Sequence, residues 1–149
     1  MKEKFKFLPH TADIKFQAFG EDLEDCFKSA GLALTNIICK QKINSKIKKR
    51  IKVNGRDRER LLYEFLEEII YLLDIGDFLV GDIKNLKIKS EKNKKDRYDQ
   101  ILTAEFYGDD INNYQAETDV KAVTYNDMFV KSPSENKSNE FSCQVVVDV

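Results

Sequence analysis

The sequence predicts an α+β fold: a two-layer single domain in which two amphipathic helices pack on a mostly antiparallel or mixed β-sheet of about seven strands. Three observations support this fold class. Two segments carry apolar residues at steps of three and four, and several others alternate between apolar and polar residues. The 149 residues contain no linker, repeat or low-complexity block, which is the size and continuity of one domain spanning residues 1–149.

The first two strands are expected at residues 5–8 and 13–19. Pro9 closes the first strand, and Gly20 ends the second. Within the second strand, alternate residues are apolar and share one face: Ile14, Phe16 and Ala18.

The first helix is expected over residues 23–39. Asp22 can cap its start, and Asp25 is favourable in its first turn, where the helix dipole attracts negative charge. The apolar residues form a single stripe, made of Leu23, Phe27, Ala30, Leu34 and Ile37. One stripe predicts that the helix covers one face of the sheet.

The second helix follows Asp57, its expected cap, and ends near residues 74–76. Glu64, Glu67 and Glu68 are expected on its outer side, as a solvated face rather than as catalytic acid and base. The buried stripe consists of Leu62, Phe65, Leu66, Ile69 and Leu73.

Most of the remaining chain is expected to form strands. Asn54-Gly55 is typical of a turn, and residues 91–99 are a polar hairpin connection. Residues 128–131 continue or pair with the strand before them, and residues 132–140 form a Ser/Asn/Lys-rich loop. The expected strands are 47–53, 82–90, 100–107, 117–125 and 141–149.

The charge is nearly balanced, with 25 Lys and Arg against 26 Asp and Glu and a net charge of −1. This balance argues against a general nucleic-acid coat, which needs a basic surplus to displace counterions. It leaves room for a local basic patch. The basic stretch at residues 46–52 is expected to be a solvated strand face, with contacts to RNA or to a partner protein as alternatives.

The cellular location is expected to be the cytoplasm. No apolar run approaches the roughly 18 residues that a membrane span needs, and the first residues lack the apolar segment of a signal peptide. The sequence contains three cysteines, an odd number, and their spacing matches no zinc or redox pattern. They are Cys26, Cys39 and Cys143. Free thiols in a reducing compartment are the simplest interpretation.

The usual catalytic motifs are missing from the sequence. It contains neither a Walker-type loop nor G-x-G-x-x-G, and none of its serines or cysteines lies in a recognised nucleophile setting. His10 is the sole histidine and is favoured as a hydrogen-bonded structural residue. The residues that remain are carboxylates and one lysine.

Asp148 closes a Val-rich strand, and the carboxylate of Val149 follows it. This aspartate either protrudes into water or meets other carboxylates around a cation. Ligation by oxygen atoms alone suits Ca²⁺, Mg²⁺ or Mn²⁺. Asp119 and Lys121 lie two apart in an expected strand and would share a face with Val123 and Tyr125.

Three short motifs in order resemble those of the archease family. They are H10-T11-A12-D13-I14, V120-K121-A122-V123-T124-Y125 and V145-V146-V147-D148-V149, and the entry into the first helix at residues 20–27 also fits. Many archeases have histidine after T-Y, whereas this chain has Asn126, which forms hydrogen bonds but does not titrate. The resemblance covers essentially the whole chain.

The resemblance implies a protein cofactor without catalysis of its own. Archeases activate the GTP-dependent tRNA-splicing RNA ligase, which joins RNA ending in a 2′,3′-cyclic phosphate or 3′-phosphate to a 5′-hydroxyl. They accelerate transfer of GMP to the ligase and allow repeated turnover. The implied partners are this 3′-phosphate RNA ligase and, through it, tRNA, with neither membrane nor DNA.

Carried over by position, the resemblance implies a divalent metal site. Calcium is the first choice and magnesium or manganese the alternatives, and Lys121 and His10 would support the site. The implied metal ligands are Asp13, Asp119, Asp148 and the terminal carboxylate of Val149. Two other function classes stay open: a metal-dependent hydrolase or nuclease using the same carboxylates, and a chaperone-like adaptor in which they are structural.

Overall fold

The computed structural model describes residues 3–9 and 13–149. The helices are α1 (Leu23–Ile38), α2 (Arg58–Gly76), the short α3 (Pro133–Asn136) and the 3₁₀ turn η1 (Ile111–Asn113). The strands are β1 (Phe5–Leu8), β2 (Ile14–Gly20), β3 (Ile47–Gly55), β4 (Phe78–Lys92), β5 (Tyr98–Asp110), β6 (Ala122–Lys131) and β7 (Phe141–Asp148).

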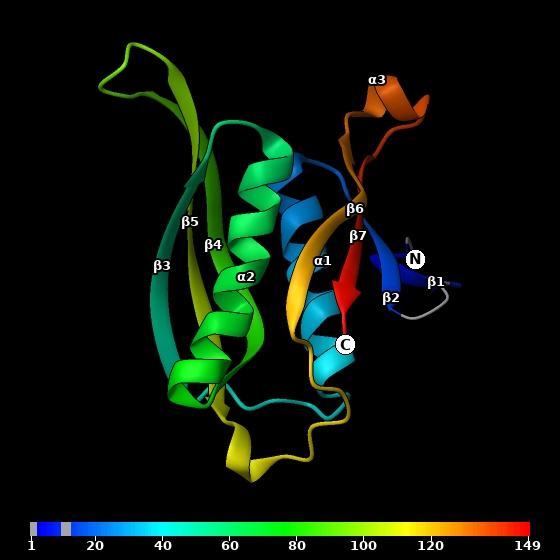
Figure 1. Ribbon diagram of the computed structural model, residues 1–149, viewed down its shortest axis with the longest axis vertical. Coiled ribbons are helices and arrows are strands. Elements are labelled where there is room, and N and C mark those ends of the chain that lie inside the picture. The colour runs from blue at the N-terminus through cyan, green and yellow to red at the C-terminus, as the bar shows by residue number, and fades with distance from the viewer. Residues whose placement is uncertain (1–2, 10–12) are drawn as a thin grey trace.

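The seven strands form two sheets, and every pairing among the described residues is antiparallel. The four-stranded sheet has the order β1-β2-β7-β6, and the three-stranded sheet has the order β3-β5-β4. The α+β class, the two long helices and the strand number predicted from the sequence are therefore confirmed. The strands are divided between two sheets, however, and α1 and α2 lie between them (Figure 1).

The burial of α1 explains why it lies between two sheets. Besides the expected stripe, its small residues Ser29, Gly31 and Ala33 are also buried. A methyl group built at Gly31 would lie 2.5 Å from Cδ1 of Ile83 in β4, so the helix and this strand are in close contact. The helix therefore has a second buried face, which small residues create without adding to the apolar stripe.

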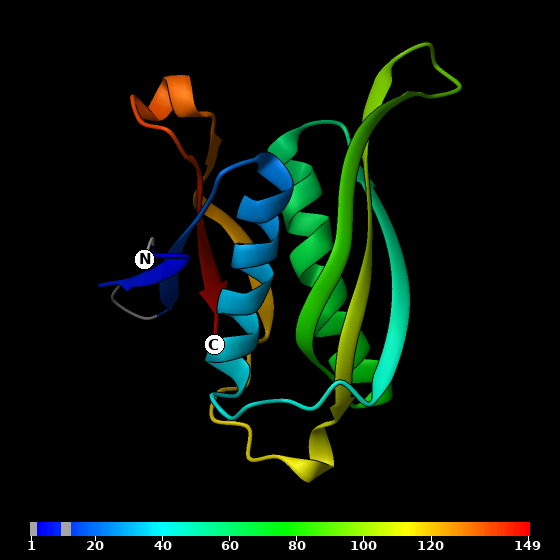
Figure 2. The same cartoon turned by 180° about the vertical axis from the view of Figure 1, so that it is seen from behind.

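The side chains of α2 complete the central layer. The ring of Phe65 lies 6.2 Å from that of Phe27 in α1 and 5.8 Å from that of Phe106 in β5, measured between centroids. These rings join both helices to the three-stranded sheet, while α2 also contacts β6 of the other sheet (Figure 2). Among the described residues, no helix is long and apolar enough to cross a membrane.

The two long helices begin in the same way. The carboxylate of Asp22 accepts a hydrogen bond from the Asp25 amide at 2.7 Å, and that of Asp57 accepts one from the Arg60 amide at 2.8 Å. Both caps confirm the sequence prediction. Each helix follows directly from a strand. The turn expected at Asn54-Gly55 was wrong, because both residues are paired within β3 and the chain turns only after Gly55.

The segment before β6 corrects one prediction. The strand expected from residue 117 begins only at Ala122 and extends to Lys131, with an irregularity in its pairing to β7 between Thr124 and Phe129. Lys121 is exposed whereas Val120 and Val123 are buried, so Lys121 does not share a face with Val123. Val120 and Val123 are three residues apart and both buried, whereas residues on one face of a strand are two apart. This is possible because Val120 precedes the regular strand. The expected loop after β6 also contains α3.

The three cysteines are buried and have free thiols. Cys26 lies in α1, and Cys143 lies in β7. Cys39 is the C-cap of α1 rather than part of the helix, and its amide donates to the carbonyl of Thr35 at 2.8 Å. A hydrogen bond with the neighbouring Cys26 thiol, followed by burial, raises the pKa of Cys143, so Cys143 remains a protonated packing residue.

Candidate functional site

The candidate site lies at one end of the four-stranded sheet, where β7 is flanked by β2 and β6. Ile14 pairs with Val147, so Asp13 and Asp148 are the next residues outward on adjacent strands. On the other side Ala122 pairs with Asp148, and the Lys121 amide donates to the Asp148 carbonyl at 2.8 Å. We call this group the acidic tip; it comprises Asp13, Lys121, Asp148 and Val149, together with Asp119, which precedes Lys121 by two residues.

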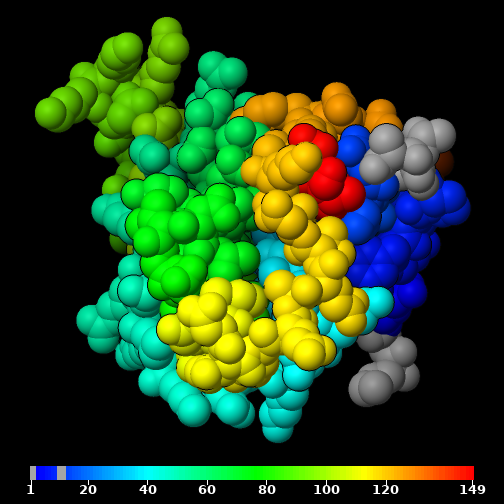
Figure 3. Space-filling model, turned by 60° about the horizontal axis from the view of Figure 1, so that its bottom comes forward, coloured from blue at the N-terminus to red at the C-terminus, as the bar shows by residue number. Residues whose placement is uncertain are grey.

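The tip faces solvent. Asp119, Lys121 and Asp148 are exposed, while Asp13 and Val149 are half-buried. In Figure 3 the C-terminal residues, coloured red, reach the surface between the segment that leads into β6 and the start of β2. The functional groups of the tip are therefore accessible to a macromolecular partner without any rearrangement of the fold.

A pocket of about 410 Å³ adjoins Asp13. Its walls include Asn36 and Lys40 at the end of α1 and Glu117 and Thr118 before β6. The Lys40 ammonium lies 3.5 Å from the Glu117 carboxylate, and the Glu117 amide donates to the carbonyl of Ile38 at 2.8 Å. These two contacts hold the segment before β6 against the end of α1.

Glu67 of α2 positions the start of β6. One of its carboxylate oxygens accepts a hydrogen bond from the Val123 amide at 2.9 Å. β6 is an edge strand, so this amide has no neighbouring strand on that side. Glu67 was expected on a solvated face; instead it is half-buried and fastens to α2 the strand that carries the neighbours of Asp148.

Comparison with known proteins identifies the family. The sequence profile of the Archease protein family (MTH1598/TM1083) matches residues 5–149. The protein belongs to the archease family. An archease from Pyrococcus furiosus is 37% identical over 143 residues, covering 94% of each chain. One from Methanosarcina barkeri is 32% identical over 150 residues, covering 99% of this chain and 97% of the relative.

A solved structure shares the archease fold described above. It is the solution structure of Methanobacterium thermoautotrophicum protein 1598, which superposes with a TM-score of 0.76 at 28% sequence identity. The match covers 98% of this chain and 99% of the other. The family predicted from the three sequence motifs is thus confirmed over residues 5–149, and the α+β fold class predicted from the hydrophobic patterns agrees with this solved structure.

The residues of this archease tip offer the type of ligand atom that a divalent cation needs, but too few of them for a complete coordination shell. Asp13 and Asp148 offer oxygen donors from adjacent strands, as a hard cation requires. Among residues 3–9 and 13–149, no three side chains of Asp, Glu, His or Cys are grouped closely enough to hold a metal ion. The described side chains therefore make at most an open site, with coordination positions left for other donors.

Two further residues were singled out from the sequence. His10 lies outside the described residues. Asn126, at the position where many archeases have histidine, is exposed within β6, and its amide donates to the Thr124 hydroxyl at 3.3 Å. Asn126 lies four residues into the strand from Ala122, at the irregularity between Thr124 and Phe129.

Sequence reasoning missed the residues that support the tip rather than compose it. Asn36, Lys40, Glu117 and Thr118 line the pocket beside Asp13, and Glu67 holds β6. None of them lies in a motif. The partners of Lys40 and Glu67 come from segments far along the chain, so no local pattern could have identified these roles.

Proposed function

We propose that this protein is a non-catalytic activator of a GTP-dependent RNA ligase in the cytoplasm and acts in tRNA splicing. In this account it speeds the transfer of GMP from GTP to the ligase and allows repeated turnover. Membership of the archease family over residues 5–149 supports the proposal. So does the absence, within the sequence, of any recognised nucleophile or phosphate-binding loop.

One observation carries the proposal: the antiparallel register of β2 and β7 makes Asp13 and Asp148 neighbours although they stand near opposite ends of the sequence. Two exposed or half-buried carboxylates at a sheet end repel one another and do not help the protein to fold. Such a pair is maintained more readily for binding than for stability.

The proposed ligands of a divalent metal are Asp13 and Asp148, joined by Asp119 and Val149. Calcium is our first choice, with magnesium or manganese as alternatives. When bound, the metal would supply positive charge at a surface that faces the ligase. Lys121 would offset the repulsion between the carboxylates in the metal-free tip, and His10 would support the loop before Asp13.

A direct experiment compares the ligase with and without this protein. We expect faster accumulation of the GMP–ligase adduct and many ligation turnovers at substoichiometric amounts of the protein. Equal rates in both reactions would contradict the proposal. Cleavage of RNA by the purified protein with Mg²⁺ or Mn²⁺ would instead identify a metal-dependent nuclease, and metal-independent binding to several unrelated proteins would identify an adaptor.

Metal binding is tested separately by calorimetric titration with Ca²⁺ and Mn²⁺. Because few protein carboxylates are available, we expect weak binding, with a dissociation constant on the order of 10⁻⁴ M. Asp148→Asn should weaken it at least tenfold, whereas Asp96→Asn in the β4–β5 hairpin should leave it unchanged. Unaltered metal binding by Asp148→Asn would contradict the proposed metal site. The ligase assay would still test activation independently.

A further inference from the structure

The outer face of the three-stranded sheet carries a concentration of positive charge. Both helices pack on the opposite, inner face of this sheet, which leaves its outer face uncovered (Figures 1 and 2). Exposed cationic side chains project along both outer strands, although the whole chain has a net charge of −1. We call this surface the basic face; its cations are Lys48, Arg50 and Lys52 of β3 and Lys84, Lys87 and Lys89 of β4.

The strand register arranges these cations in two rows with β5 between them. Arg50 and Lys84 are both paired with Glu105, and Lys52 and Lys87 are both paired with Thr103. Because β3 and β4 are each one strand away from β5, the rows are separated by about 10 Å. The basic face is thus a strip lined by positive charge on both sides.

Glu105, the carboxylate on β5 between the rows, is neutralised by its neighbours. It accepts a hydrogen bond from the Asn85 amide at 2.7 Å and lies 3.0 Å from the Lys48 ammonium and 3.7 Å from Nε of Arg50. The Asn85 hydrogen bond, followed by Lys48, lowers the pKa of Glu105. A second carboxylate, Glu91 of β4, lies 3.3 Å from the Lys89 ammonium. The two carboxylates therefore partner three of the six cations, and those without an ion pair among the described residues are Lys52, Lys84 and Lys87.

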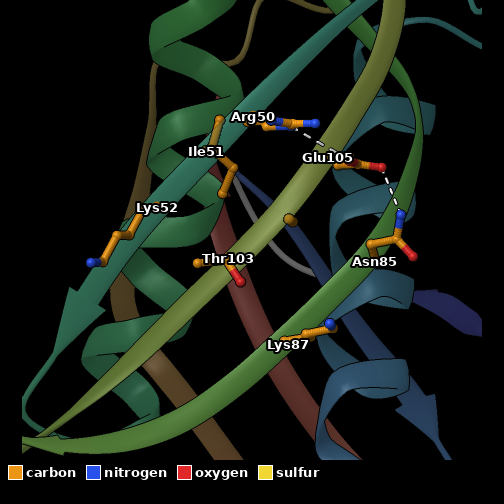
Figure 4. A pocket seen from close by; sticks show the side chains of 8 residues that line it. Arg50, Ile51, Lys52, Asn85, Lys87, Thr103 and Glu105 are labelled. Carbon is orange, nitrogen blue, oxygen red and sulfur yellow. Dashed lines mark hydrogen bonds and ion pairs between the residues drawn. The ribbon is translucent and has the colours of Figure 1, made fainter.

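Two lysines at the centre of the strip are free to bind an anion. Neither Lys52 nor Lys87 has a carboxylate within ion-pair distance in the part of the chain that the structure describes. Both line a shallow pocket of about 380 Å³, together with the hydroxyl-bearing Thr103 on its floor (Figure 4). The pocket therefore combines unpaired cations with a neutral hydrogen-bonding group.

We propose that the basic face binds the phosphate backbone of single-stranded RNA lying along β5. Two facing rows of cations, spaced every second residue along β3 and following the same register along β4 after its shift between Lys84 and Lys87, suit a ligand whose negative charges also repeat along its length. The strip is only about 10 Å wide between rows, which suits one strand. A preference for RNA over DNA rests on the proposed function; the recognition of phosphate does not.

Two other anionic partners fit less well. A membrane surface is bound through apolar side chains as well as cations. Among the described residues, the large exposed apolar side chains do not lie at the outward positions that the cations occupy. An acidic protein surface rarely offers evenly repeated charges. The basic face also lies on the opposite sheet from the acidic tip, so RNA and the ligase could be bound together (Figure 1).

The test uses the full chain without the ligase and a fluorescent single-stranded RNA of 12 nucleotides, measured by anisotropy. If all six cations act, log Kd should change with log salt with a slope near 4, a loss of about 300-fold in affinity between 50 and 200 mM salt. The triple variant Lys52→Gln, Lys87→Gln, Lys89→Gln should bind at least tenfold more weakly, with the slope reduced by about 2.

The matched control carries the same change of charge on the other side of the molecule: Lys4→Gln, Lys6→Gln, Lys137→Gln. It should bind like the unaltered protein. Equal weakening in both triple variants, or no RNA binding by the unaltered protein, would overturn the proposal. Binding to polyglutamate or to phosphatidylserine vesicles but not to RNA would also overturn it. A DNA strand of the same sequence shows whether binding depends on the sugar. Because the substitutions leave the acidic tip unchanged, a lack of RNA binding would not contradict the ligase proposal.

Discussion

Asp109 is a buried carboxylate that the fold holds in its charged form. It is 4% exposed, and the Tyr114 hydroxyl donates to it at 2.8 Å. The backbone amide of Asp110 donates to its other oxygen at 2.8 Å, and the Lys46 ammonium lies 3.9 Å away. The Tyr114 hydrogen bond is the main cause of a lowered pKa at Asp109. This carboxylate organises the turn η1, from which the chain returns towards the acidic tip.

The lowered pKa makes stability depend on pH in a defined direction. A carboxyl whose pKa is lower in the folded state stabilises the protein above its unfolded pKa of about 3.9, and this contribution is lost as the pH falls through the folded value. Tyr114→Phe should therefore lower the free energy of unfolding at pH 7 and reduce the further loss between about pH 5 and 2. Urea unfolding across this pH range measures both effects.

The control for this prediction is Tyr98→Phe. This substitution also removes a tyrosine hydroxyl, but Tyr98 is 64% exposed and lies away from Asp109 in the sequence. It should keep the acid dependence of the unaltered protein. If Tyr114→Phe and Tyr98→Phe lose stability in parallel as the pH falls, the hydrogen bond to Asp109 does not control its ionisation.

At the scale of elements, the position of β6 depends on α2. The Glu67 carboxylate is the acceptor for the Val123 amide, and a hydrogen bond to a charged group contributes about 1.5–3 kcal/mol. We expect Glu67→Ala to lower the free energy of unfolding by about 1–2 kcal/mol, since water can partly replace the lost acceptor. Glu67→Gln keeps an acceptor oxygen and should recover most of this loss.

Hydrogen exchange of the Val123 amide distinguishes this role from a general effect of helix substitution. The exchange should speed up in Glu67→Ala and much less in Glu67→Gln. Equal loss of stability in the two variants, with an unchanged exchange rate, would show that the hydrogen bond is not what holds β6.

The junction between β2 and α1 depends on a glycine. A methyl group at Gly20 would lie 2.2 Å from the backbone nitrogen of Cys26, and backbone atoms in the first turn of a helix cannot move away easily. Gly20→Ala should therefore lower the free energy of unfolding by about 1–3 kcal/mol. Gly76→Ala is the control, because no atom lies within 4 Å of its added methyl group. Thermal unfolding of both variants measures the difference, and equal melting temperatures would contradict the account.

At the scale of the whole molecule, local patterns predicted the elements but not their arrangement. The caps Asp22 and Asp57 were predictable because a cap acts on the amide three residues later. The division into two sheets was not, because it depends on small residues of α1 such as Gly31, which an apolar stripe does not reveal. Likewise, no pattern along the chain shows that Lys52 and Lys87 lie on either side of Thr103.

The residues of the acidic tip were predicted from the resemblance to archeases, and the sheet register shows that two of them lie on adjacent strands. Asp13 and Asp148 become neighbours only through pairing of the strands that follow and precede them. Composition and spacing could not reveal this. Asp119 and Lys121 were expected in a strand and instead lie in the segment before it. This segment contacts the end of α1 through Glu117, and it reaches β7 only at Lys121, whose amide donates to the Asp148 carbonyl.

The central claim is that the acidic tip activates an RNA ligase, and multiple-turnover ligation tests it most directly. The double variant Asp13→Asn, Asp148→Asn and the control Asp96→Asn are each added at substoichiometric amounts after both are shown to unfold like the unaltered protein. The account predicts that the control supports many turnovers per ligase molecule, while the double variant leaves the rate at that of the ligase alone. Full activation by the double variant would contradict it.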